Sequence, residues 1–286
     1  MRAQGRLADL TTVPAADHVC WVYDDDASFD AAVRDFIEAG LARGDRLLCV
    51  GERVIDSLRG QHALLRDVES LLAEGALETL TVAQAYDATG HFCPERQLEF
   101  YGTATRRALA DGYRGLRVVA DVSPLADQPA LLSDLLRWEH LVDEYIAHGS
   151  GFSAMCAYRR ELGTAFLGEA ASTHPVVHAP DGLPSFRLFF DDGRLAVAGS
   201  VDTFSAALMS RALAGCPVTG PRTRLDLRRV EFLDVAACRV LALWAADLRE
   251  RSVDVEIHGA PHLVRRMWQL LDLSDIAPVS FVEESA

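Results

Sequence analysis

The sequence predicts an α/β fold in two parts: a parallel sheet covered by helices, followed by a smaller α/β domain. In the first part, short runs that are apolar on both faces, such as His18–Tyr23, alternate with amphipathic stretches. This alternation is typical of strands in a parallel sheet with helices on both sides. Segment 174–184 contains several prolines and a glycine, which indicates a linker. The 286 residues are enough for two domains.

Apolar spacing and helix-end signals predict the elements of the first part. The first helix places Phe29, Val33 and Ile37 on one face and ends near Gly44, and Pro94 lies at the start of a later helix. The expected strands are 18–23, 46–50, 77–82, 116–122, 152–158 and 176–178. The expected helices are 27–42, 54–73, 94–109, 131–148 and a short one that ends near residue 171.

The second part begins with a hairpin pattern, in which Asp192-Gly193 separates the alternating runs 186–190 and 195–198. A helix after Asp202 is expected to end near Gly215. The run 223–227 predicts a strand that leads through a polar corner to Asp234, which fits the N-cap of a helix at 235–251. A strand at 253–258, a helix at 261–271 and a strand at 279–282 complete the prediction.

Composition excludes several classes of function. The chain has a net charge of −14, and all 28 of its basic residues are arginine. Without lysine it cannot form a Walker A phosphate site, a Schiff base or a pyridoxal-phosphate linkage. The acidic charge without a basic stripe predicts no direct nucleic-acid binding. No apolar run is long enough to predict a membrane span, and no secretion signal is visible, so we expect a cytoplasmic protein.

Polar residues gather where the predicted parallel strands end. Asp24, Glu52, Asp121 and Tyr158 each lie at or just beyond the carboxyl end of a strand. Ligands of parallel sheets bind at this edge, so these residues predict a small-molecule pocket.

The segment DLRRVEFLDVAAC from Asp226 to Cys238, together with GSVDTFSAAL around Asp202, resembles the STAS domain of anti-sigma-factor antagonists. The resemblance covers residues 185–283 and implies a protein-binding module. The family's phosphorylated serine corresponds to Val235, so the resemblance implies no phosphosite in this loop. It also implies a docking surface at Asp202, Asp234, Val235 and Ala236. The alternative is an unrelated small α/β domain in which Asp234 is an ordinary cap.

Segments such as HVCWVYDDDASF, AYDATGHFCPERQL and GYRGLRVVADVSPLA resemble the MEDS domain, the sensory domain of a dichloromethane-responsive regulator. This resemblance covers residues 15–180 and implies a RecA/KaiC-like parallel-sheet fold without a P-loop. The positions that match the family pattern are His18, Cys20, Tyr23, Tyr86, Arg117, Asp121, Glu139, Cys156, Tyr158, His174 and Pro175. With the strand-end residues, the predicted ligand-binding set is His18, Tyr23, Asp24, Glu52, Asp121, Glu139, Tyr158 and His174.

The cysteines and histidines predict neither a metal site nor a cofactor. No C-x-x-C pair is present, and cysteines within apolar runs are typical of buried reduced thiols. His18, Cys20, Cys156 and His174 could be imagined around an ion, since His18 and Cys20 lie on one face of a strand. Their spacing matches no known ligand signature, so we expect no metal and no catalytic residue.

The two resemblances together predict a cytoplasmic sensor in signal transduction and transcription regulation rather than an enzyme. The MEDS-like domain would detect a small molecule or a partner. The STAS-like domain would bind an anti-sigma factor, its kinase domain or another STAS protein. A KaiC-like enzyme acting on nucleotides and a scaffold without any ligand are the alternatives.

Overall fold

The computed structural model describes residues 2, 4–6, 17–59, 65, 67–86, 92–180, 182 and 184–283. They form two compact units, a larger one from Arg2 to Leu183 and a smaller one from Pro184 to Ala286. Both are α/β, which confirms the predicted fold class. Within the described residues, no helix is long and apolar enough to cross a membrane.

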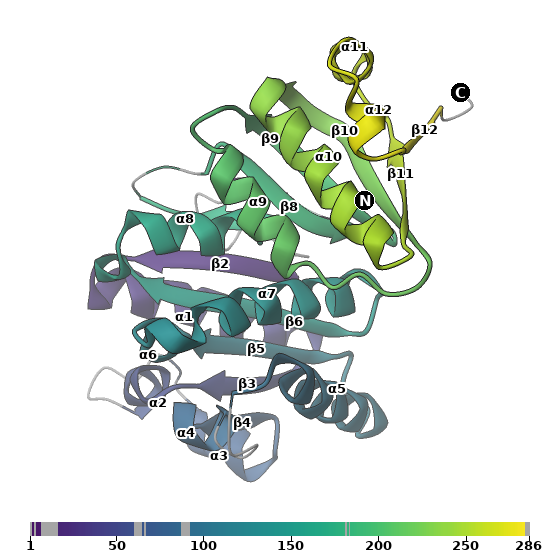
Figure 1. Ribbon diagram of the computed structural model, residues 1–286. Coiled ribbons are helices and arrows are strands. Elements are labelled where there is room, and N and C mark those ends of the chain that lie inside the picture. The colour runs from purple at the N-terminus through teal and green to yellow at the C-terminus, as the bar shows by residue number, and fades with distance from the viewer. Residues whose placement is uncertain are drawn as a thin grey trace. The chain divides into compact units, whose positions relative to one another are not determined.

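The larger unit is built on a sheet in which every pair of neighbouring strands is parallel. Among the described residues its strand order is β1-β7-β2-β6-β5-β3-β4, so the chain crosses over repeatedly (Figure 1). The central strands are buried on both faces, as their apolar sequences require. The strands are β1 Gly5–Arg6, β2 His18–Tyr23, β3 Arg46–Val50, β4 Leu77–Leu80, β5 Leu116–Asp121, β6 Phe152–Arg159 and β7 Val176–His178.

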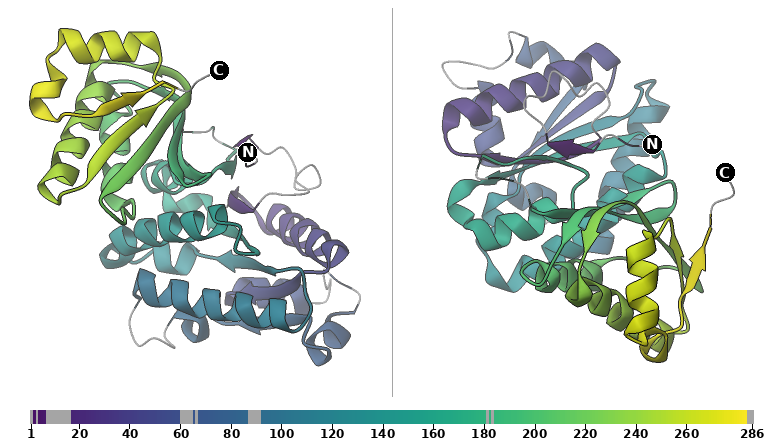
Figure 2. Two further views of the ribbon diagram at one scale, coloured as in Figure 1. Left: turned by 90° about the vertical axis from the view of Figure 1, so that its right-hand side faces the viewer. Right: turned by 90° about the horizontal axis from the view of Figure 1, so that it is seen from above.

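Helices cover both faces of this sheet (Figure 2). Helices α1 Asp26–Arg43, α2 Glu52–Arg59 and α3 Val68–Ala73 pack against one face through an apolar cluster that includes Phe29, Phe36 and Leu58. The opposite face holds a second cluster that includes Tyr101 and Trp138. The helices on that face are α4 Val82–Tyr86, α5 Pro94–Ala110, α6 Ser123–Ala126, α7 Leu132–Ala147 and α8 Thr164–Ser172.

The structure corrects three predictions in the larger unit. The expected helix 54–73 is not continuous, because Leu65 and Asp67 lie in a bend and a turn between α2 and α3. Strand β4 ends at Leu80, and Val82 already starts α4. The expected linker does not begin at residue 174, since β7 lies within it.

The smaller unit contains a mixed five-stranded sheet of order β12-β11-β10-β9-β8 among its described residues. Strands β8 Phe186–Asp191 and β9 Arg194–Val201 form the predicted antiparallel hairpin. Asp192 and Gly193 both have positive φ in its turn, 53° and 67°, as a two-residue turn of this hand requires. The other strands pair in parallel and are β10 Arg222–Leu233, β11 Asp254–His258 and β12 Ser280–Val282.

Helices α9 Ala206–Gly215 and α10 Val235–Glu250 lie side by side on this sheet, followed by α11 His262–Leu270 and α12 Leu273–Ile276 (Figure 1). The polar corner expected after residue 227 is instead a pair of register shifts within the long strand β10. Arg228 folds back there onto the buried carboxylate of Asp226. A β-bulge within the strand therefore takes the place of the polar loop that the sequence predicted.

We predict that Gly115→Ala destabilises the larger unit and that Gly168→Ala does not. A Cβ atom at residue 115 would lie 2.1 Å from the backbone oxygen of Gly151, which belongs to the turn before β6 and cannot move aside. Such overpacking costs about 1–3 kcal/mol. A Cβ at Gly168, inside α8, meets nothing within 4 Å, so alanine should stabilise the helix by about 0.5–1 kcal/mol. Urea denaturation followed by circular dichroism measures both; equal effects would contradict the packing described.

Candidate functional site

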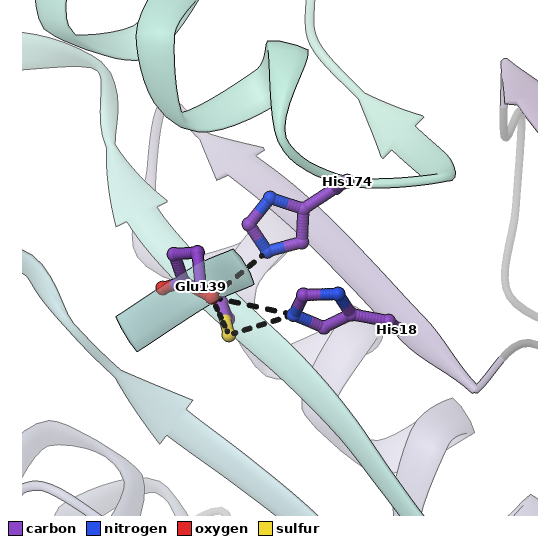
Figure 3. A group of neighbouring side chains, drawn as sticks. His18, Glu139 and His174 are labelled. Carbon is purple, nitrogen blue, oxygen red and sulfur yellow. Dashed lines mark hydrogen bonds and ion pairs between the residues drawn. The ribbon is translucent and has the colours of Figure 1, made fainter. Parts of the chain in front are cut away.

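Four side chains that could bind a metal or a proton meet at the centre of the larger sheet. His18 begins β2, Cys156 lies in β6, Glu139 comes from α7, and His174 lies just before β7. Strand alternation places His18 on the face of the sheet that α7 covers. All four residues are buried. Figure 3 shows the two imidazoles and the carboxylate of Glu139 pointing toward one another. We call these four residues the buried cluster.

One carboxylate oxygen lies at the middle of the buried cluster. Glu139 Oε2 is 3.3 Å from His18 Nε2, 3.3 Å from His174 Nε2 and 3.3 Å from Cys156 Sγ. The sulfur is 4.0 Å from His18 Nε2. The donor atoms of the four residues all lie within 4.8 Å of one another.

A second layer of contacts holds these side chains in place. His18 Nδ1 lies 3.0 Å from Asp143 Oδ1, and that carboxylate also pairs with Arg2 at 2.9 Å. His174 Nδ1 lies 2.7 Å from the backbone oxygen of Ala170. The hydroxyl of Tyr158 donates to Glu139 Oε1 at 2.5 Å. Each imidazole is therefore anchored through Nδ1 and directs Nε2 at Glu139.

The charges of the buried cluster depend on one another. Burial opposes protonation of His18, but hydrogen bonds to Asp143 and Glu139 outweigh it and raise its pKa to about 9. Burial also disfavours a charged Glu139, yet the neighbouring imidazoles lower its pKa. Burial and the charge of His18 lower the pKa of His174, and burial raises that of the Cys156 thiol. When the buried cluster holds no metal ion, His18 is therefore a cation that lies between the carboxylates of Glu139 and Asp143.

A different group of polar side chains lies at the carboxyl ends of β2 and β5. Tyr23 Oη is 3.4 Å from Asp121 Oδ1 and 3.5 Å from Ser123 Oγ. Ser123 in turn accepts from the backbone N–H of Arg159 at 2.9 Å. The guanidinium of Arg53 lies 5.2 Å from the centre of the Tyr23 ring. We call Tyr23, Arg53, Asp121 and Ser123 the strand-end group.

The predicted ligand-binding residues therefore do not form one pocket. His18, Glu139, Tyr158 and His174 come together in the buried cluster, whereas Tyr23 and Asp121 belong to the strand-end group. Side chains alternate between the two faces of a strand, and His18 and Tyr23 are an odd number of positions apart in β2. They therefore point to opposite faces of the sheet and cannot share a site. The other two predicted residues lie apart at the surface. Asp24 pairs with Arg160, and Glu52 accepts from the backbone N–H of Val82 at 3.4 Å.

A cavity of about 490 Å³ lies at the amino ends of β3 and β5. Its walls come from the start of those strands and from α5, and they include Arg46, Glu78, Arg96 and Phe100. Arg46 spans the inner end through ion pairs to Glu78 and Asp111. Nothing in the sequence pattern distinguished these residues from ordinary strand and helix positions.

The predicted docking residues of the smaller unit lie on two adjoining loops. Asp234 caps α10 by accepting from the backbone N–H of Ala237 at 2.9 Å and from the Thr203 hydroxyl at 2.8 Å. These hydrogen bonds lower its pKa against the opposing effect of partial burial. Asp202 accepts from the backbone N–H groups of Phe204 and Ser205. Both carboxylates therefore hold the loops together.

The side chains that these loops leave exposed are apolar. Phe204 is 95% exposed and Val235, the first residue of α10, is 38% exposed. Ala236 beside it is half-buried. Sequence reasoning identified Val235 through its alignment with the family serine but missed Phe204. It also missed Asp143 and Arg2, which support His18 from distant positions.

Comparison with known proteins identifies both units. Residues 17–175 match the family described as the MEthanogen/methylotroph, DcmR Sensory domain, abbreviated MEDS. Residues 185–282 match the family described as Mlab, STAS domain. The order of the two domains is the predicted one. No curated protein matches the chain.

We expect Asp143→Asn to destabilise the larger unit by about 3 kcal/mol, because removing one partner of a buried ion pair leaves the other charge without compensation. Asp143 supports both His18 and Arg2, and its side chain has no solvent exposure. The matched control is Asp134→Asn in the first turn of the same helix, where the helix dipole accounts for no more than about 1 kcal/mol. Urea denaturation compares the two variants, and equal losses of stability would refute this role of Asp143.

Proposed function

The chain belongs to the MEDS sensory-domain family and carries a STAS domain behind it, and we propose that it is a sensor that acts by binding another protein. In this proposal the larger unit binds a small molecule, and the smaller unit binds an anti-sigma factor, its kinase domain or another STAS protein. The protein then regulates transcription through that partner and catalyses no reaction.

The observation that carries the proposal is the start of helix α10. Asp234 caps this helix, and the next residue, Val235, exposes a hydrocarbon side chain where a phosphate acceptor would lie. A phosphoserine there would add a dianion at the helix N-terminus and change docking through charge. Valine cannot be phosphorylated, so the docking surface keeps the same charge. Regulation must then come from elsewhere in the chain, for which the sensory domain is the candidate.

The exposed apolar side chains support a protein partner. The Thr203–Asp234 hydrogen bond joins the loop that carries Phe204 to the loop that carries Val235. Exposed apolar side chains that gather on a surface mark protein-binding sites, where aromatic residues such as phenylalanine are enriched. Asp202 and Asp234 hold the loops that present Phe204 and Val235, and the two carboxylates would lie at the rim of the binding surface.

The strand-end group supports a small polar ligand for the sensory domain. A phenol, a carboxylate, a hydroxyl and a guanidinium meet there at the carboxyl edge of a parallel sheet, where such sheets bind ligands. Burial raises the pKa of Asp121 above its ordinary value even though Ser123 donates to it. A ligand that brings a hydrogen-bond donor to this carboxylate would recover part of its desolvation cost.

We expect Phe204→Asp and Val235→Arg each to weaken partner binding at least about tenfold without unfolding the protein, since truncation of a hot-spot residue costs more than about 1 kcal/mol. The control is Leu270→Arg, because Leu270 is 70% exposed at the end of α11 and belongs to neither of these loops. Calorimetry against purified anti-sigma factors and STAS proteins of the same genome measures the affinities. Unchanged binding by both loop variants would exclude this surface.

A thermal-shift screen of the full chain against metabolites and nucleotides tests the sensory part. A ligand that binds only the folded state raises Tm by mass action, and Asp121→Asn should abolish the shift if the strand-end group binds it. A shift with ATP that survives this variant would favour the nucleotide-dependent enzyme. A folded protein that responds to no compound but binds a partner would instead be a scaffold.

A further inference from the structure

We propose that the buried cluster of His18, Glu139, Cys156 and His174 binds a divalent transition-metal ion of the zinc class through four protein ligands. The inference concerns the interior of the larger unit and does not depend on the partner or the small molecule proposed above. It departs from the expectation drawn from the sequence, which was that no metal is bound.

The distances within the buried cluster fit a tetrahedral site. Bond lengths of about 2.0–2.3 Å to nitrogen, oxygen and sulfur place neighbouring ligand atoms roughly 3.3–3.8 Å apart. Glu139 Oε2 lies 3.3 Å from each of the other three ligand atoms. The Cys156–His18 separation is 4.0 Å, and no pair exceeds 4.8 Å. A small contraction around one point would complete the coordination.

The hydrogen bonds of His174 leave a buried lone pair directed at this point. Its Nδ1 lies 2.7 Å from the carbonyl oxygen of Ala170, which can only accept, so the ring proton is on Nδ1. Nε2 then carries a lone pair and lies 3.3 Å from the carboxylate of Glu139, another acceptor. Within the described part of the chain this buried nitrogen makes no hydrogen bond. Two buried acceptors face to face are unfavourable, and a cation between them removes the conflict.

The surroundings of the other ligands have the form that protein metal sites use. Asp143 accepts from His18 Nδ1, which is the carboxylate–histidine–metal arrangement and leaves Nε2 for the ion. Tyr158 fixes the second oxygen of Glu139 at 2.5 Å. These contacts set the direction of each ligand before any ion binds.

Charge balance also favours a divalent ion. The Cys156 thiol and the Nε2 of the cationic His18 each lose a proton to solvent when they coordinate the ion, and the thiolate and the Glu139 carboxylate together neutralise its two positive charges. The remaining carboxylate, Asp143, is neutralised by Arg2. A filled site is therefore neutral overall, as complete burial requires.

The ligand types select the ion and its role. Thiolate and imidazole suit zinc or cobalt, whereas magnesium and calcium require oxygen ligands. Four protein ligands leave no open coordination position, which is typical of structural zinc sites. The ion would connect β2, β6, α7 and the segment before β7. Glu139 rather than Cys20 is the fourth ligand, because Cys20 does not belong to the group whose donor atoms lie within 4.8 Å.

The first test is metal analysis of the full chain produced in zinc-supplemented medium. We expect one zinc per chain by elemental analysis, and chelation should lower Tm. Replacement of zinc by cobalt(II) should produce the ligand-field bands of a tetrahedral site and a sulfur-to-cobalt charge-transfer band. Absence of stoichiometric zinc together with a wild-type protein that develops no such bands with cobalt(II) would overturn the proposal.

Variants then test which residues are ligands. Cys156→Ser should remove the charge-transfer band, while Cys49→Ser, at an equally buried cysteine of β3, should keep it. Cys20→Ser should keep the band at full intensity, whereas a weaker band would show that Cys20 is also a ligand and would overturn the assignment of Glu139. Tyr158→Phe keeps the ring but removes the hydrogen bond to Glu139, so we expect a 10–100-fold loss of zinc affinity in a folded protein. Unchanged affinity in this variant would contradict the proposed support of the site.

Discussion

The larger unit depends on a single buried carboxylate. Glu139 comes from a helix, yet its oxygens contact side chains from β2, from β6 and from the segment before β7, and all of these groups are buried. A charge in such a place is costly unless it is compensated. The positions of the sheet and of helix α7 are therefore fixed by the need to surround Glu139 with partners, and Asp143 and Arg2 extend the same constraint outward.

Local chemistry made much of the fold predictable. Three predicted features depend only on residues that are close in sequence, and the structure contains all of them: strands that are apolar on both faces, the Asp-Gly hairpin and the Asp234 cap. The buried cluster was harder to predict from the sequence, because Glu139 lies 121 residues from His18 and 17 from Cys156. The family resemblance named the members, but only the strand pairing shows which of them meet. Cys20 and Cys156 are register partners in β2 and β6, yet Glu139 occupies the fourth position.

The loops that carry Asp202 and Asp234 illustrate how one residue can have a structural and a functional interpretation at once. The family resemblance implied a docking surface that includes Asp202 and Asp234, and the hydrogen bonds of both carboxylates are directed into the loops. A carboxylate that accepts from backbone N–H groups fixes local geometry and has less capacity left for a partner. The exposed faces of Phe204 and Val235 then supply apolar area. The same residues that terminate secondary structure thus determine what the surface presents.

The separation of the buried cluster from the strand-end group assigns them different roles. The two groups lie on opposite faces of one sheet, since His18 and Tyr23 differ by an odd number of positions in β2. A small molecule that enters at the carboxyl edge can reach Tyr23 and Asp121. To bind the proposed metal ion, which already has four protein ligands, it would have to displace one of those ligands. The proposed ion would therefore affect recognition only by holding β2 and β6 in register. Tyr23 of the strand-end group lies at the end of β2, and Arg159 at the end of β6 donates its backbone N–H to Ser123. In these two proposals, a ligand would bind to a framework that the metal ion has already fixed.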